Sequence, residues 1–351
     1  MARDLLLWVL LAAALAALVA YERALSRGES DARETHDRIG RLIPAEEREG
    51  LKVAAIRVTP FRGSAQTYVP AGGLWRCPSH FNAVAGEEAV NALLKSLLDA
   101  EGVVQSKDSG RARDYGLDRE GSHSVGLLGV GGEVLIQIDL GSRLEDLGGC
   151  YARRADRPGI WSIDTDPWQA LAVDPDGLRP PLLDPHVIPR AWPGKSRRID
   201  RVVIEAAGGP RLELTLEELR ISEEELRSGK LPYLWHLTVG GEPQDASTQN
   251  AMQYTSFLLR TPFVRALDPR RAEELGLTES ASRVVLFPAE GEPAELRVGG
   301  ALPSGGVLLA NLQMDTLFEV APEVAGLVIP DPGLLGAAAT SSPWEVWLRR
   351  E

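Results

Sequence analysis

The spacing of apolar residues predicts helices and strands that follow one another along residues 51–331. Apolar residues recur at i, i+3, i+4 and i+7 from Glu88 to Leu98, which predicts an amphipathic helix with one buried face. Apolar residues recur at every second position in Ser124–Leu128 and in Val134–Asp139, and the glycine-rich Gly129–Gly132 between them predicts a hairpin turn. We therefore expect an α+β protein with mostly antiparallel sheets, each covered on one face by a helix.

Two sequence motifs occur twice, and their copies are 160 positions apart. Gly73–Arg76 (GLWR) corresponds to Tyr233–His236 (YLWH), and Tyr115–Asp118 (YGLD) corresponds to Leu275–Thr278 (LGLT). Apolar positions between these motifs also match in order. A repeat at a fixed separation predicts a duplicated structural unit.

The openings of the two copies differ in length. The predicted strands Val53–Val58 and Ile199–Ile204 correspond if the second copy carries an insertion of about fourteen residues. The charged segment Leu216–Lys230 is that insertion. We expect the two copies to share one strand order, with Trp75 and Trp235 at equivalent, largely buried positions.

The motifs and composition divide the chain into six segments. They are a transmembrane signal anchor at 1–21, a charged juxtamembrane stalk at 22–50, a first α+β repeat at 51–165, a proline-rich connector at 166–196, a second α+β repeat at 197–331 and a C-terminal tail at 332–351. Mixed charges predict that the stalk is solvated. The alanine- and serine-rich stretch of the tail predicts partial disorder there.

Leu5–Tyr21 is a run of seventeen residues without a charge. As a helix it spans roughly 25 Å, slightly less than the ~30 Å hydrocarbon core of a bilayer. We interpret it as an uncleaved single-pass anchor that contacts membrane lipid, with a cleaved signal peptide and a buried helix as alternatives. The flanking charges are nearly balanced, so the expected extracytoplasmic position of the bulk of the chain rests on the long sequence after a single N-terminal span.

Composition mainly excludes classes of function. The formal net charge of −12 at pH 7 argues against a nucleic-acid partner, because binding to phosphates needs clustered positive charge. Two cysteines exclude a disulfide-rich scaffold and a four-cysteine zinc site. Cys77 and Cys150 can pair in an exported protein, but two buried free thiols are the favoured interpretation. The excess of arginine over lysine is typical of a GC-rich bacterial genome.

The sequence predicts no catalytic, cofactor-binding or metal-binding residues. Asp164–Asp166 (DTD) has the form of a metal clamp, but the following Pro167 favours a strand end that caps the next turn. The histidines lack the spacing of metal ligands, and we expect each of them on the surface or in a loop. They are His36, His80, His123, His186 and His236.

The order of five motifs resembles that of a bacterial protein family. The motifs are Gly73–Trp75, the helix Glu88–Leu98, Asp114–Asp118, Tyr151–Arg153 and Ile199–Ile204. Together they resemble the domain-of-unknown-function family numbered 4340, over about residues 45–205 and more loosely beyond. The resemblance implies one N-terminal membrane span, an exported α+β region, and partners that are permease and ATPase subunits of gliding-motility-type ABC transporters. The family has no established catalytic residues to carry over.

These observations together favour a non-catalytic, membrane-anchored accessory or scaffold protein of an ABC-type transport or envelope-assembly complex. The anchor is inferred from the sequence, whereas the ABC connection is implied by the resemblance. One alternative is an extracytoplasmic module that binds a glycan or peptide between its two lobes. The other is a hydrolase that uses acids such as Asp114, Asp118 and Asp164 as general acid and base, which requires two carboxylates to converge on one cleft.

Overall fold

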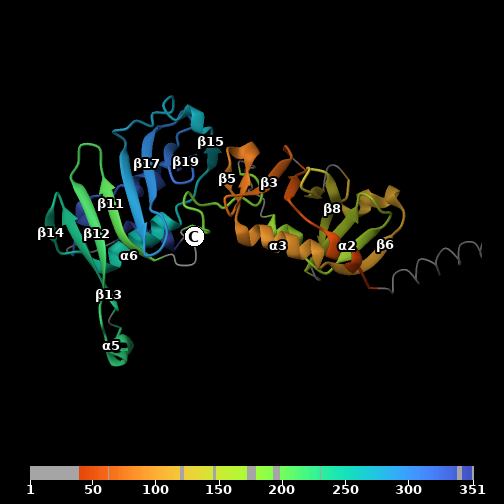
Figure 1. Ribbon diagram of the computed structural model, residues 1–351, viewed down its shortest axis with the longest axis horizontal. Coiled ribbons are helices and arrows are strands. Elements are labelled where there is room, and N and C mark those ends of the chain that lie inside the picture. The colour runs from red at the N-terminus through yellow and green to blue at the C-terminus, as the bar shows by residue number, and fades with distance from the viewer. Residues whose placement is uncertain are drawn as a thin grey trace, which may run out of the picture. The chain divides into compact units, whose positions relative to one another are not determined.

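The computed structural model of the chain describes residues 39–349 with internal gaps. The positions left out within this range are 62, 119–121, 145–147, 172–178, 193–197, 230 and 338–341. The described residues form two compact units, whose elements are labelled in Figure 1. The first unit contains residues 39–65 and Asn91–Leu171, and the second contains Gln66–Val90 and the residues from 179 onward.

The first unit is built on an antiparallel sheet. Its strands in spatial order are β1 (Gly40–Arg41), β6 (Glu101–Ser106), β10 (Ile160–Ile163), β9 (Gly149–Arg154), β8 (Val134–Leu144), β7 (His123–Leu128) and β2 (Ala55–Thr59). Every neighbouring pair in this order is antiparallel. Ile56 and Val58 on β2 and Val125 and Leu127 on β7 are fully buried, as the period of two along a strand requires.

Short helices accompany this sheet. They are α2 (Ala45–Gly50), the C-terminal part of α3 (Glu87–Leu98), the 3₁₀ helix η2 (Ser109–Tyr115) and α4 (Pro167–Ala170). On α3, Leu93 and Leu97 are fully buried, which agrees with the predicted amphipathic helix. The carboxylate of Asp166 caps α4 by accepting the amide of Trp168, so this aspartate acts as the predicted cap.

Residues 39–50 belong to the first unit and not to a solvated stalk. Strand β1 pairs with β6, and the side chains of Leu42 and Ile43 that follow it are buried. Glu47 on α2 binds Arg154 on β9 at 2.7 Å. The stalk prediction is therefore wrong at this end, because two adjacent apolar residues within a charged segment pack into the core. Residues 22–38 and the apolar run Leu5–Tyr21 lie outside the described residues.

The second unit contains a larger antiparallel sheet. Its strands in spatial order are β14 (Glu242–Gln244), β13 (Tyr233–Val239), β12 (Arg211–Glu218), β11 (Ile199–Glu205), β16 (Ser282–Pro288), β17 (Ala294–Ala301), β18 (Val307–Asn311), β19 (Thr316–Val320) and β15 (Arg265–Leu267). All of these neighbouring pairs are antiparallel. The predicted α+β fold with mostly antiparallel sheets is thereby confirmed.

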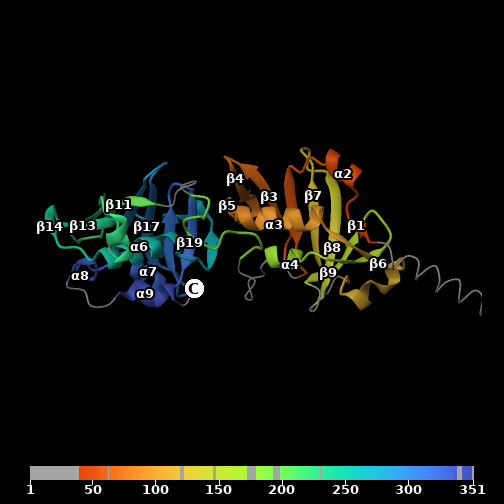
Figure 2. The ribbon, with the colours of Figure 1, turned by 90° about the horizontal axis from the view of Figure 1, so that it is seen from below.

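Helices cover one side of this second sheet, as Figure 2 shows for α6, α7 and α9. The helices of the unit are α5 (Glu223–Arg227), α6 (Thr248–Leu259), the 3₁₀ helix η3 (Pro269–Arg271), α7 (Pro322–Val328), α8 (Pro332–Leu335) and α9 (Pro343–Leu348), and α5 lies away from the sheet. The ring of the fully buried Trp344 on α9 lies 5.1 Å from the ring of Tyr254 on α6. The sequence predicts a peripheral tail here, but its tryptophan completes the core.

Residues 66–90 form a small meander that packs with the second unit. Its elements are β3 (Gln66–Ala71), β4 (Leu74–Cys77), the 3₁₀ helix η1 (Pro78–His80) and β5 (Ala83–Val84). Val84 belongs to the same buried cluster as Tyr254 and Phe257 of α6. The connector also pairs with this meander, because the amide of Asp184 donates to the carbonyl of Val84 and Ala85 bridges to Leu183.

The two halves of the chain repeat one strand order. Strands β6-β10-β9-β8-β7-β2 in the first half have the same sequence of connections as β15-β19-β18-β17-β16-β11 in the second. Each half also has a meander, β3-β4-β5 and β12-β13-β14, followed by a helix, α3 and α6. Trp75 and Trp235 both lie on the middle strand of a meander, but only Trp235 is buried, within the cluster around α6. The expected equivalent positions are therefore confirmed, and Trp75 is partly buried.

The repeated Gly-Leu motif lies against a strand irregularity in both halves. Gly116 ends η2 with a φ of +66°, and β8 is irregular between Leu140 and Arg143, directly beneath it. A Cβ on Gly116 would overlap Ser142 Oγ and lie 2.9 Å from the Ser142 amide nitrogen. In the second half, Gly276 has a φ of +84°, and its added Cβ would lie 3.6 Å from the backbone of Gly300 in the corresponding irregularity of β17.

A Gly116→Ala substitution should destabilise the first unit more than Gly132→Ala in the β7–β8 turn. Both positions have positive φ, which costs roughly 1 kcal/mol for alanine. Only Gly116 also has a neighbour too close for a Cβ, because none lies within 4 Å of Gly132. We expect about 1–3 kcal/mol of additional loss in the free energy of unfolding, measured by urea titration. Equal losses would contradict the close packing of η2 on β8.

Candidate functional site

The three aspartates of the hydrolase hypothesis have separate partners. Asp114 pairs with Arg111 at 3.1 Å, and Asp118 lies 3.9 Å from Arg113. Asp164 accepts the backbone amide of Glu101 at 2.9 Å. Within the part of the chain that the structure describes, no three metal-ligating side chains come together.

The histidines differ in their surroundings. His236 is exposed and pairs with Glu217 at 2.6 Å, so the predicted surface position is confirmed for it. His123 is only 2% exposed, and His186 is also buried, so the expectation of surface or loop histidines is wrong for His123. His186 lies in a loop as expected, although the loop is buried. His36 lies outside the described residues.

His123 is held among aromatic side chains. Its ring centre is 4.4 Å from that of Trp168 in an edge-on contact and 6.0 Å from that of Phe61. Neither ring nitrogen has a hydrogen-bond partner within the described residues. Burial lowers the pKa of His123, because the charged form loses its hydration. The neutral imidazole is therefore the form that this packing accepts.

The connector of the second unit is organised by one buried carboxylate. Asp184 accepts the backbone amide and the Nδ1 of His186, at 3.1 and 2.6 Å, and the amide of Arg190 at 2.6 Å. These contacts close a turn in a proline-rich segment that has few backbone donors. The same segment bonds to its neighbours through Val187, whose amide donates to Thr261 and whose carbonyl accepts from Asn311. The sequence analysis did not predict this role of Asp184. A turn in which an aspartate side chain accepts the backbone amide two residues later is common, so the sequence contained a signal for it.

The two cysteines are buried free thiols. Burial raises the pKa of Cys77, and burial followed by the charge of Asp166 raises the pKa of Cys150 to about 12. Thiol nucleophiles react as thiolates, so neither side chain has the environment of a reactive cysteine.

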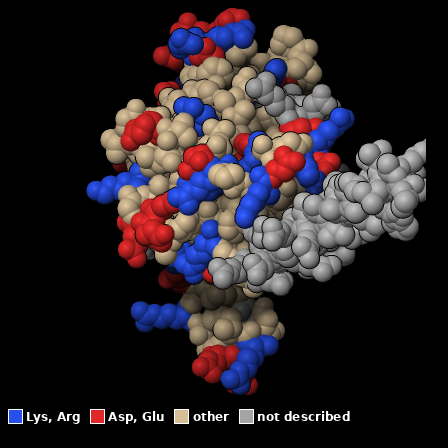
Figure 3. All heavy atoms as spheres, turned by 90° about the vertical axis from the view of Figure 1, so that its right-hand side faces the viewer, with Lys and Arg blue, Asp and Glu red and all other residues tan. Residues whose placement is uncertain are grey.

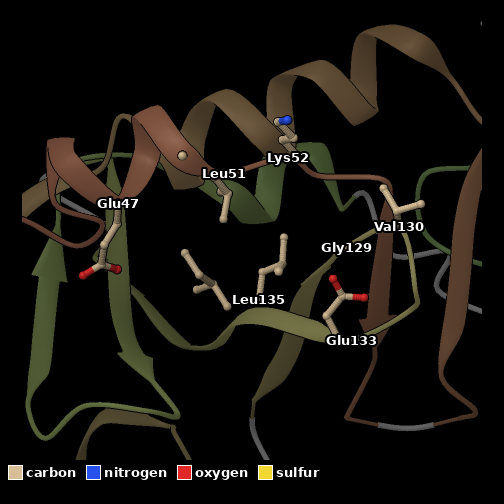
Figure 4. Close-up of a pocket in the computed structure, with 9 residues that line it drawn as sticks. Glu47, Leu51, Lys52, Gly129, Val130, Glu133 and Leu135 are labelled. Atoms are coloured by element: carbon tan, nitrogen blue, oxygen red, sulfur yellow. The ribbon is translucent and has the colours of Figure 1, made fainter.

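A hollow of about 460 Å³ lies beside the start of β8 in the first unit (Figure 4). In Figure 4, Leu51 points from the segment after α2 into the hollow, towards Leu135. The other lining residues are Glu47, Gly50, Lys52, Gly129, Val130, Glu133 and Ile136. Strand β9 ends opposite Ile138, so β8 continues past its neighbour at this point. The hollow is of a size that accepts a small ligand or a short extended peptide.

The second unit carries a projecting hairpin arm, which we define as residues 219–229 and 231–232. Figure 1 shows β12 and β13 extending below the sheet with α5 at the tip. The amide of Leu219 donates to the carbonyl of Pro232 at the base of the arm. At the tip, Ser222 and Glu225 form a reciprocal capping box that fixes the start of α5. Figure 3 shows acidic and basic side chains gathered at this lower end of the molecule.

Apolar side chains are exposed on and next to the arm. Leu226 on α5 is 54% exposed, Leu231 is 40% exposed, and the adjoining Leu234 on β13 is 38% exposed. Nine large apolar residues are exposed among the described residues, and three of them fall within this stretch of nine positions. Single exposed apolar residues are ordinary, but a cluster on a projection is typical of an interaction surface.

Comparison with known proteins identifies one family. The model of the domain of unknown function (DUF4340) matches residues 75–182. The predicted resemblance is confirmed over this segment. No curated protein matches the chain, and no solved structure matches it. The DUF4340 segment runs from β4 through the first repeat to Leu182 in the connector, and the hairpin arm lies beyond it.

Acidification should destabilise the protein partly through His123. An unfolded histidine has a pKa of about 6.5 and takes up a proton before the buried ring does. The contribution of neutral His123 to the free energy of unfolding is therefore fully present above about pH 6.5. It is lost as the pH falls towards the lowered pKa of the folded state. Burial also lowers the pKa of His80, which adds to the same trend. We expect the melting temperature of His123→Phe to fall less than that of the wild type between pH 7.5 and 5.5. The control is His236→Gln at an exposed site, for which we expect the same fall as in the wild type. A fall of the same size in all three proteins would contradict this role.

An Asp184→Asn substitution should destabilise the second unit by about 2–3 kcal/mol, because an amide cannot accept all three buried hydrogen bonds. Asp331→Asn is the matched control. Asp331 caps α8 with one exposed bond to the amide of Gly333, and asparagine caps a helix about as well as aspartate. Calorimetry of both variants measures the difference, and a similar loss in each would show that Asp184 does not organise the connector.

Proposed function

We propose that this protein is a non-catalytic, membrane-anchored accessory or scaffold subunit of an ABC-type transport or envelope-assembly complex. The bulk of the chain is extracytoplasmic in this proposal, and Leu5–Tyr21 holds it in the cytoplasmic membrane. The match of residues 75–182 to DUF4340 carries the proposal, since it supports the resemblance that implies ABC components as partners. The uncharged run at the N-terminus supports the membrane attachment. The described residues contain no helix long and apolar enough to cross a bilayer.

The described structure is consistent with a role in assembly. Most of its ion pairs link neighbouring strands or turns, such as Arg153 with Asp139 across β8 and β9 and Arg283 with Glu205 across β11 and β16. Such pairs fix the local geometry of neighbouring strands. The cluster of exposed leucines on the hairpin arm adds a surface suited to protein contact.

The hollow beside β8 supports a second candidate, a peptide-binding module. Leu51 and Leu135 give the hollow apolar lining, and the start of β8 pairs with β7 but has no strand partner on its β9 side, which suits an extended chain. The hydrolase hypothesis has no comparable support, because Asp114, Asp118 and Asp164 bind to separate partners.

The full chain, purified in mild detergent from its own membranes, should bring down a permease and an ATPase. Washing the membranes with carbonate should leave it in the pellet at full length, because an apolar span is not extracted by high pH. The control is the same chain without residues 1–30 and with a cleavable export signal, which should appear in the soluble fraction.

Recovery of the protein alone would reject the scaffold proposal. If it then binds peptides saturably, and Leu51→Trp blocks that binding by filling the hollow, the peptide-binding module is the better assignment. Release of a chain that begins near Tyr21 would instead identify the N-terminal run as a signal peptide.

A further inference from the structure

His123 lies where the chain leaves the first unit. The chain passes from the first unit to the second after Ala65 and again after Leu171. Phe61 lies shortly before the first passage, and Trp168 on α4 lies shortly before the second. Both rings contact the imidazole of His123, with their ring centres 6.0 and 4.4 Å from its own. One buried side chain on β7 therefore packs against both segments that lead out of the unit.

These two segments are held less firmly than the sheet on which they lie. Strand β7 pairs with β2 on one side and with β8 on the other. Helix α4 has only four residues, and Trp168 attaches it through the His123 contact and through a bond from its Nε1 to the carbonyl of Gly141 at 3.0 Å. Phe61 lies in an irregular segment whose described residues carry no charge. When the surroundings of His123 open, we therefore expect these segments to move before the strands do.

The closed site accepts only the neutral form of His123. The side chain is buried, and neither Nδ1 nor Nε2 has a hydrogen-bond partner within the described residues. A protonated imidazole carries a positive charge and two N–H donors, so it needs water or acceptors that this packing does not supply. Burial accordingly lowers the pKa of His123. Uptake of a proton therefore requires the site to open to water.

The charged side chains on the neighbouring elements do not compensate for a charge on His123. Arg57 on β2 and Asp139 on β8 pair with residues that alternate with His123 along β7, so they lie on the other face of the sheet. Asp139 is bound to an arginine at 2.7 Å. Asp166, the cap of α4, binds Arg143 of β8 at the same distance. Both carboxylates thus have a partner of opposite charge already.

We propose that His123 is a pH-sensitive latch, which in its neutral form holds α4 and the segment around Phe61 against the first sheet and releases both when it takes up a proton. The latch controls the two passages that lead from the first unit to the second. The passage back, between Val90 and Asn91, lies inside α3 and is unaffected. Such a latch is independent of any ABC partner. It also differs from a general loss of stability in acid, because two short segments respond before the rest of the unit.

Hydrogen exchange of the full chain in mild detergent, read by mass spectrometry, tests the latch. Protection factors are compared at pH 7.5 and 5.5 after correction for the intrinsic exchange rates. A histidine in the opened form has a pKa of about 6.5, so protonation favours opening about tenfold more at pH 5.5 than at pH 7.5. We expect protection of residues 60–66 and 165–171 to fall by up to this factor, and that of β9 in the same sheet to stay constant. An equal fall in β9 would show general destabilisation and overturn the latch.

Replacement of the imidazole tests whether His123 causes the response. His123→Phe keeps an aromatic ring beside Trp168 and cannot take up a proton, so protection of both segments should be the same at the two pH values. His123→Leu is a second variant with the same expected result. The control His236→Gln, at an exposed site, should keep the fall seen in the wild type. A fall that persists in a folded His123 variant would assign the response to another group and overturn the proposal.

Fluorine NMR of the wild-type chain labelled with 5-fluorotryptophan gives a measurement that needs no folded His123 variant. The resonance of Trp168, assigned by its loss in Trp168→Phe, should move between pH 7.5 and 5.5 as the ring leaves the imidazole. The resonance of Trp344, which is fully buried beside α6, should stay in place. A Trp168 resonance that does not move over this range would overturn the latch.

Discussion

In each half of the chain, a glycine with positive φ packs against an irregular stretch of a strand that also contains glycine. This contact determines how the turn after the short helix crosses the sheet. Gly116 ends η2 where β8 departs from regular pairing, and the backbone carbonyl of Tyr115 lies so close to Gly141 that no Cβ fits there. Gly276 lies beside Gly300 with more room, because a Cβ added to Gly276 would be 3.6 Å from the Gly300 backbone. Because the two backbones touch, the turn after the helix can cross the sheet without a layer of side chains between them. Leu117 is then carried into the core.

Among the described residues, the buried charged side chains of Arg154, Asp184 and Glu319 each have charged partners or backbone donors. Arg154 is almost completely buried, and its guanidinium binds Glu47 at 2.7 Å and Asp156 at 2.6 Å. The hydrogen bonds from Arg154 lower the pKa of Asp156. This network attaches α2 to the end of β9, whereas the carboxylate of Asp184 closes a turn within the connector. Removing one partner from such a site leaves a buried charge without compensation, which costs far more than the loss of a surface pair. Most other ion pairs lie at the surface and contribute little.

Periodicity predicted the elements well because each of them buries one face locally. The helix at Glu87–Leu98, the strands β7 and β8 and the glycine turn between them all follow from spacing in the sequence. The buried His123 could also have been predicted, because it lies on the same face of β7 as Val125 and Leu127.

The features that sequence could not show depend on contacts between distant segments. Nothing local indicates that Val84 packs with Tyr254, or that Trp344 from the end of the chain fills the space beside α6. The arm, by contrast, is visible in the sequence as a charged insertion, but only the structure shows its leucines exposed at the end of a ribbon. Duplication explains why such an insertion is tolerated. A hairpin that two glycines can close, as Gly72 and Gly73 do between β3 and β4, has no structural need of twelve more residues, so the arm can change while the sheet that carries it stays intact. The copy without an arm retains the fold in its simplest form.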